Sequence, residues 1–140
     1  MNKHVSAGRA NRAAAAATEG GARKTALQAK IGRTYRFEAA HYLPRVPQGH
    51  RCRNLHGHNY RVTIVLRGSL DARGFVKDFA EIDSVVEPLV DQLDHRLLND
   101  VEGLENPTAE IIATWFFDRI PDCERVCVYE NDDSWAEVVR

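Results

Sequence analysis

The stretch HNYRVTIVLRG, residues 58–68, alternates between apolar and polar side chains. Its large apolar residues occupy every second position: Tyr60, Val62, Ile64 and Leu66. Alternation with a period of two is typical of a β-strand that buries one face and exposes the other. We therefore predict a strand here, and His58 shares the parity of its buried face.

The same alternation occurs upstream in TYRFEAAH, residues 34–41, whose shared face contains Tyr35, Phe37, Ala39 and His41. Residues 43–55, between the two stretches, are rich in Pro, Gly and Arg, which favours a loop. We expect the two strands to pair antiparallel on either side of this loop. We also predict a short third strand in GFVKDF, residues 74–79.

After residue 78 the apolar period becomes helical. The apolar residues recur at Phe79, Ile82, Val85, Val86, Leu89, Val90 and Leu93. This spacing predicts a helix with one buried face, and Asp78 can cap its first turn. Pro88 should bend or split the helix, because proline cannot donate the helical hydrogen bond. A second helix is expected to begin after Thr108, its N-cap, and to stop at Pro121.

Two further strand-like stretches close the chain, ERVCVYE at residues 124–130 and WAEVVR at residues 135–140. The order along the chain is therefore strands, then helices, then strands, with short links. This order predicts an α+β fold, in which an antiparallel β-sheet carries two helices packed on one face.

The chain has 140 residues, enough for one domain with a hydrophobic core and too few for two. Residues 1–30 are rich in Ala and Arg, so we expect a disordered extension ahead of a single domain at residues 31–140. That domain carries 13 basic and 19 acidic residues, which argues against a nucleic-acid partner. No apolar run reaches the roughly 20 residues of a membrane span, so we expect no membrane partner.

The chain contains three cysteines, Cys52, Cys123 and Cys127. An odd number without paired spacing gives no disulfide framework, so the expected location is the reducing cytoplasm. Cys123 and Cys127 lie in a strand-like stretch, and we interpret them as small core residues.

Three histidines are expected to converge at one end of the sheet. His41 ends one predicted buried face and His58 begins the other, while His56 keeps the direction of His58 if the chain is extended there. Three histidines with an open fourth position are typical of a catalytic zinc site. The alternative is a closed structural site in which Cys52 is the fourth ligand.

Other residues near these positions could move protons. Cys52 lies four residues before His56, and a cation nearby would favour its thiolate as a base or nucleophile. Asp94 beside His95 could form a proton relay. The same pair could equally serve the end of the first helix, where a cation interacts favourably with the helix dipole.

A carboxylate, Glu130, shares the apolar face of its strand and needs a partner there. One candidate partner is a ligand edge with two adjacent N–H donors, such as that of a pterin or a guanine. Thr108 and Glu110 could add ligand contacts, or they could simply cap the second helix.

Together these stretches resemble the 6-pyruvoyltetrahydropterin synthase family, and most closely its bacterial branch, the 6-carboxy-5,6,7,8-tetrahydropterin synthases of queuosine biosynthesis. The resemblance rests on FEAAHYLPRVPQGHRC, LHGHNY, GFVKDFAE, LDHRLLNDVEGLENPTAE and VYEN, which span residues 37 to about 131. Three residues lie between Cys52 and His56, as in the carboxy branch, whereas the pyruvoyl enzymes resemble a longer C-x5-H-G-H form.

The resemblance implies three groups of site residues: His41, His56 and His58 binding Zn²⁺; Cys52, Asp94 and His95 transferring protons; Thr108, Glu110 and Glu130 holding the pterin. It implies the tunnelling fold, in which the sheets of several subunits join edge to edge into a barrel. It also implies a homo-hexamer of two trimers with sites between subunits. The expected reaction converts 7,8-dihydroneopterin triphosphate to 6-carboxy-5,6,7,8-tetrahydropterin, acetaldehyde and triphosphate, and 6-pyruvoyltetrahydropterin synthesis is the alternative.

An alternative from another class is a non-catalytic, zinc-stabilised binding module. It would use Cys52, His56, His58 and a fourth ligand for folding alone. This interpretation gives Glu130 and the Asp94–His95 pair no common role. For the enzyme reading, Arg51 and Arg53 are candidates for contacts with the triphosphate.

Overall fold

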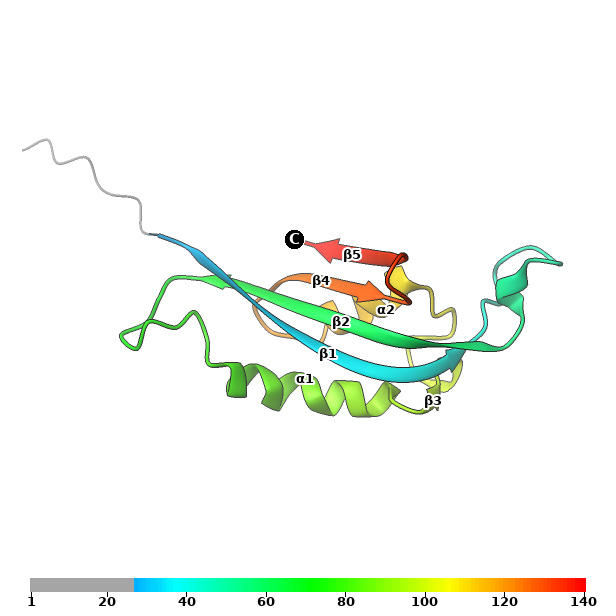
Figure 1. The fold of residues 1–140 in the computed structure, drawn as a ribbon, viewed down its shortest axis with the longest axis horizontal. Coiled ribbons are helices and arrows are strands. Elements are labelled where there is room, and N and C mark those ends of the chain that lie inside the picture. The colour runs from blue at the N-terminus through cyan, green and yellow to red at the C-terminus, as the bar shows by residue number, and fades with distance from the viewer. Residues whose placement is uncertain (1–26) are drawn as a thin grey trace, which may run out of the picture.

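The structure of the protein, a computed structural model, describes residues 27–140. The helices and strands in this part of the chain are β1 (Ala29–His41), β2 (His56–Gly68), α1 (Phe79–Leu93), β3 (Arg96–Leu97), α2 (Ala109–Phe117), β4 (Cys123–Tyr129) and β5 (Trp135–Val139). Two short 3₁₀ turns, η1 (Arg51–Arg53) and η2 (Leu98–Asp100), lie in the connections. Figure 1 shows the long β1–β2 hairpin running the length of the domain, with α1 alongside it.

The five strands form one mixed sheet in the order β3-β1-β2-β4-β5. β1, β2, β4 and β5 pair antiparallel, as the sequence predicts. The prediction of a wholly antiparallel sheet is wrong at one edge, because β3 pairs parallel with β1. The reason is the path of α1, which returns the chain along β1 in the direction of β1 (Figure 1). β3 continues in that direction, so its two residues pair in parallel.

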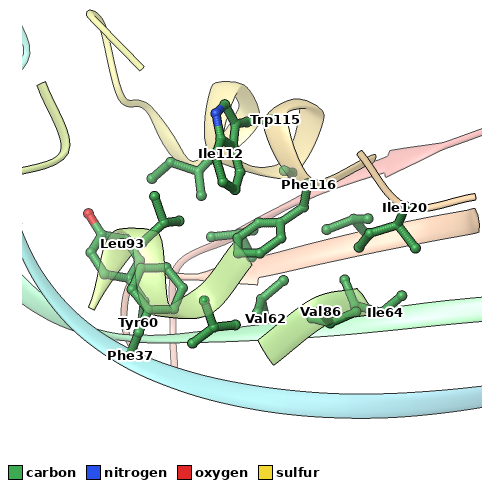
Figure 2. Packing of buried hydrophobic residues seen from close by; sticks show 14 of the residues in the cluster. Phe37, Tyr60, Val62, Ile64, Val86, Leu93, Ile112, Trp115, Phe116 and Ile120 are labelled. Atoms are coloured by element: carbon green, nitrogen blue, oxygen red, sulfur yellow. The ribbon is translucent and has the colours of Figure 1, made fainter. Parts of the chain in front are cut away.

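One face of the sheet packs against both helices, as predicted. The core cluster combines residues of β1 and β2 with residues of both helices: Phe37, Tyr60, Val62 and Ile64 with Ile82 and Val86 of α1 and Ile112 and Phe116 of α2. Figure 2 shows this cluster, in which the rings of Phe37 and Tyr60 stack with their centroids 4.9 Å apart. The core therefore ends, on β2, two residues from His58.

Both predicted N-caps are present. The Asp78 side chain accepts a hydrogen bond from the Ala80 amide and forms a capping box with Glu81, and the Thr108 side chain accepts from the Ile111 amide. Pro88 does not split α1, which is continuous from Phe79 to Leu93. It lies on the exposed side of the helix, where water can bond to the carbonyl that proline leaves without a donor.

The predicted strand at residues 74–79 is wrong. The Asp71 carboxylate accepts hydrogen bonds from the Arg73 and Phe75 amides, and the Asp71 amide donates to the Phe75 carbonyl at 2.8 Å. These bonds close a tight turn, and α1 already begins at Phe79. No stretch between the turn and the helix is left to pair with the sheet.

β1 begins two residues before the expected domain boundary, because Ala29 and Lys30 pair with Gly68 and Arg67 of β2. The remainder of the expected disordered extension, residues 1–26, lies outside the described residues. All three cysteines are free, and Cys123 and Cys127 are buried as predicted.

The sheet ends at β3 on one side and at β5 on the other. β3 covers β1 only at Ala39 and Ala40, and β5 has β4 as its one neighbour. Within residues 27–140, most of the outer edge of β1 and the outer edge of β5 thus have no partner strand. The helices in this part of the chain are all too short or too polar to cross a membrane.

Candidate metal centre and catalytic pocket

The three predicted histidines converge where β1 ends and β2 begins. His41 and His56 are partners in the antiparallel register, and His58 is the partner of Ala39. All three side chains therefore point to one face, and their candidate ligand atoms lie within 4.8 Å of one another. The shortest separation, 3.0 Å, joins Nε2 of His41 to Nε2 of His56. In Figure 1 this is the end of the hairpin next to the loop that carries η1.

Backbone carbonyls orient two of the rings. Nδ1 of His41 lies 2.8 Å from the Pro107 carbonyl oxygen, and Nδ1 of His56 lies 2.7 Å from the Asn54 carbonyl oxygen. A carbonyl can only accept, so each Nδ1 carries the proton and donates it. Each Nε2 then presents a lone pair to the centre of the triad. This arrangement is the usual support of metal-binding histidines.

Burial favours the neutral, metal-binding form of two of the rings, those of His41 and His58. Burial lowers the pKa of His41, and the neighbouring imidazoles lower it further, against the raising effect of the Pro107 hydrogen bond and of Glu130. Burial also lowers the pKa of His58. Nε2 of His58 is buried and has no hydrogen-bond partner in the described part of the chain. Three convergent histidine nitrogens, one of them without a partner, fit Zn²⁺ with an open fourth position.

Asn99 also supports the triad, through the main chain of the residue that follows His41. The Asn99 side chain, on η2, donates to the Tyr42 carbonyl at 2.8 Å and accepts from the Tyr42 amide at 3.0 Å. Tyr42 follows His41 directly, so this pair of hydrogen bonds fixes the end of β1. Neither Asn99 nor Pro107 could be predicted from the sequence. The Asn99 side chain binds main-chain groups and Pro107 acts through its own carbonyl, and neither role leaves a spacing pattern.

The histidines form part of a pocket of about 380 Å³. It is lined by His41, Leu43, Arg51, Cys52, His56, His58, Glu130, Asn131 and Ser134. Two of the other predicted site residues, Cys52 and Glu130, thus meet the triad in one cavity. Oε2 of Glu130 lies 3.9 Å from Nε2 of His58. A cavity of this size with a few convergent polar groups is typical of a small-molecule site.

Main-chain bonds hold Cys52 in this pocket. Its amide donates to Nδ1 of His50 at 3.1 Å, and its carbonyl accepts from the Leu43 amide at 2.8 Å. Within residues 27–140, the close group of ligand atoms consists of the three histidines and does not include the Cys52 thiol. The geometry therefore favours the base or nucleophile over the fourth ligand.

The Asp94–His95 pair lies elsewhere. Nδ1 of His95 is 3.0 Å from Oδ1 of Asp94, so the two residues do contact each other as predicted. The His95 side chain is 74% exposed and lines separate cavities with Glu38 and Asn59, not the one that contains Cys52. The Glu38 amide donates to Asp94 and is the main reason that the pKa of this carboxyl is lowered, with His95 the next cause.

The backbone at His95 is unusual. Its φ of 56° lies in the left-handed region, which residues other than glycine rarely adopt. Its amide donates to the Glu38 carbonyl, which helps to hold this conformation. Strained backbone of this kind often occurs at functional sites.

Thr108 and Glu110 lie at the start of α2, outside the pocket. The Thr108 hydroxyl oxygen accepts from the Ile111 amide at 3.2 Å, so it serves as a cap in this chain. Glu110 is exposed in the first turn. Their link to the triad is indirect, through Pro107, which precedes Thr108 and holds His41.

Comparison with known proteins gives a consistent family. A family model described as 6-pyruvoyl tetrahydropterin synthase matches residues 30–140. The 6-carboxy-5,6,7,8-tetrahydropterin synthase of Synechocystis sp. is 41% identical over 98 residues, 66% of this chain and 74% of that protein. The enzyme of the same name from Bacillus subtilis is 31% identical over 124 residues, 76% of this chain and 82% of that protein. Dihydroneopterin monophosphate aldolase of Pyrococcus furiosus is 36% identical over 94 residues, 67% of this chain and 76% of that protein.

A solved structure agrees with these relatives. The 6-pyruvoyl tetrahydropterin synthase of Caenorhabditis elegans superimposes with a TM-score of 0.74 at 26% identity, over 81% of this chain and 96% of that one. The family match extends from the second residue of β1 to the last residue and includes every predicted site residue. The chain therefore belongs to the 6-pyruvoyl tetrahydropterin synthase family.

Proposed function

We propose that the chain is a zinc-dependent lyase that converts 7,8-dihydroneopterin triphosphate to 6-carboxy-5,6,7,8-tetrahydropterin, acetaldehyde and triphosphate in queuosine biosynthesis. One observation carries the proposal: three convergent histidines, a cysteine and a carboxylate meet in a single pocket. Family membership and the two relatives named as carboxy enzymes support it.

In this proposal His41, His56 and His58 hold the metal. Zinc bound by them would polarise the oxygens of the substrate side chain and make its hydroxyl protons more acidic. The carbonyls of Pro107 and Asn54 keep two of the imidazoles oriented and protonated at Nδ1. The chain's own contribution is thus a rigid, partly buried set of three nitrogen donors.

Glu130 anchors the pterin. Its two carboxylate oxygens can accept from the 2-amino group and from N3–H of the ring, which form a matched pair of donors. Because Glu130 lies 3.9 Å from His58, a ring held by this carboxylate has its substituent within reach of the triad. The side chain of the substrate, where bonds are broken, is thereby placed beside the metal ligands.

Cys52 acts as the base that removes a proton from the substrate side chain. It lines the same pocket as the triad and Glu130, and it is not among the close group of ligand atoms. This role needs a free thiol, and Cys52 is free in the structure. Thiols stay free in a reducing compartment, of which the cytoplasm is the usual one. We therefore place the reaction in the cytoplasm.

The Asp94–His95 pair completes the site from a second copy of the chain. Its exposure, its left-handed backbone and its distance from the Cys52 pocket are what support this assignment. Thr108 and Glu110 would likewise contact a pterin near a subunit boundary. The unpaired edges of β1 and β5 are suited to joining sheets edge to edge, so we propose the barrel and the hexamer of two trimers.

Removal of zinc tests this function against a zinc-stabilised binding module. The zinc-loaded protein should consume 7,8-dihydroneopterin triphosphate, and a chelator should abolish turnover while leaving the far-UV circular dichroism spectrum unchanged. Loss of the spectrum together with zinc would instead indicate a structural metal. Because one relative is named a monophosphate aldolase, dihydroneopterin monophosphate should be assayed in parallel.

A further inference from the structure

The two arginines of the η1 turn have different surroundings. Nη1 of Arg53 donates to the carbonyls of Pro44 at 3.0 Å and of Val46 at 2.8 Å. These bonds tie the turn to the start of its own loop. Arg51 lines the pocket, and its guanidinium forms no hydrogen bond or ion pair with any residue in the described range 27–140.

The two arginines point in different directions from the turn. A 3₁₀ helix has three residues per turn, so successive side chains project about 120° apart. Arg51 and Cys52 share the pocket, and Arg53 points back toward residues 44–46. The His50 ring caps the turn by accepting a hydrogen bond from the Cys52 amide at 3.1 Å.

The pocket is lined by groups of opposite charge, which come from two different connections. Glu130 and its neighbours Asn131 and Ser134 come from the β4–β5 connection, beside His58. Arg51 comes from the loop between β1 and β2, together with Cys52 and Leu43. The histidine triad lies at the end of β1 and the start of β2, in the same pocket. Glu130, the triad and Arg51 line the same cavity, so one ligand can contact all of them.

We propose that Arg51 binds the phosphate tail of the substrate, whereas Arg53 is structural. This inference rests on the proposed function and adds to it the residue that recognises the phosphates. A guanidinium presents a planar pair of N–H donors that fits two phosphate oxygens, and Arg51 has no other partner for them in the described chain. The pterin ring then lies at Glu130 and the phosphates at Arg51.

Isothermal titration calorimetry with inorganic triphosphate tests this assignment on the zinc-loaded protein. Charge-assisted hydrogen bonds are strong enough that Arg51→Gln should weaken triphosphate binding about tenfold or more. Arg51→Lys should restore part of that affinity. Arg45→Gln makes the same charge change on the same loop but outside the pocket, and it should stay within about twofold of the parent protein. Zinc content is measured before and after each titration.

Dihydroneopterin, which lacks phosphate, separates this inference from the proposed function. It should bind the parent protein and Arg51→Gln equally well. If dihydroneopterin fails to bind but triphosphate binding still depends on Arg51, the phosphate site stands and the pterin function is wrong. Triphosphate that binds Arg51→Gln as tightly as the parent, or that does not bind the parent, would overturn the assignment of Arg51.

Discussion

Replacing Cys52 by alanine separates the two roles open to this thiol. As a base, Cys52 removes a substrate proton, and the zinc remains on His41, His56 and His58. As a fourth ligand, it holds the metal itself. The substitution removes one sulfur atom from a partly buried position and leaves the main chain unchanged. The bonds to His50 and Leu43 use main-chain groups of Cys52, so they persist in the variant.

The structure sets the expected magnitudes. Because no packed core side chain is lost, the free energy of unfolding should change by less than about 1 kcal/mol. Turnover should fall by the ~10²–10⁴-fold that a positioned acid or base usually contributes. If Cys52 were a ligand, zinc content and stability would fall together, because the affinity of a structural zinc site, about 10–16 kcal/mol, is folding free energy.

The assay measures zinc per subunit, melting temperature and single-turnover rate on the same purified variant. Cys127→Ala is the matched control: Cys127 is a buried sheet residue away from the pocket, so its loss should cost some stability and no chemistry. Full zinc with collapsed turnover in Cys52→Ala supports the base. Loss of zinc and of stability in this variant would refute the proposed mechanism.

Three further predictions follow from other parts of the structure. Glu130→Gln should weaken dihydroneopterin binding roughly 30-fold or more at unchanged zinc content, since losing a charge-assisted pair costs about 2–5 kcal/mol; calorimetry that finds equal affinity rejects the anchor. Burial lowers the pKa of His41 and His58 below the usual 6.5, so below that pH the unfolded chain binds more protons than the fold. The urea concentration at which half of the metal-free protein is unfolded should therefore decrease as the pH is lowered from about 7.5 to about 5.5. A concentration that stays constant over this range contradicts the prediction. A chain beginning at Leu27 should keep zinc content, oligomer size and turnover within about twofold, because β1 begins at Ala29; loss of the oligomer would show that residues 1–26 are needed.

Much of the fold can be predicted because burial leaves a periodic trace. The alternation in residues 58–68 reports which face of β2 is buried, and the helical spacing after Asp78 does the same for α1. β3 has only two residues, Arg96 and Leu97, and no period can be read from two positions. The predicted strand near Phe75 is absent because the hydrogen bond from the Phe75 amide to Asp71 closes a turn there. The turn bends the chain away from any neighbouring strand.

The histidine triad could be predicted from the sequence, because strand alternation and the hairpin register together place the three side chains on one face. The hydrogen bonds that orient the triad could not be predicted, because every residue has a main-chain carbonyl and those of Pro107 and Asn54 leave no mark in the sequence. The location of His95 also could not be predicted. Its position depends on where α1 ends against β1, which the local spacing of Asp94 and His95 does not specify.

The carbon–carbon cleavage is the central claim, and acetaldehyde is its most direct measure. Zinc-loaded protein is incubated with 7,8-dihydroneopterin triphosphate, and acetaldehyde and pterin products are quantified together. One acetaldehyde should form for each 6-carboxy-5,6,7,8-tetrahydropterin, and none should form with Cys52→Ala. Accumulation of 6-pyruvoyltetrahydropterin without acetaldehyde, or no consumption of the substrate by the zinc-loaded protein, would contradict the proposed function.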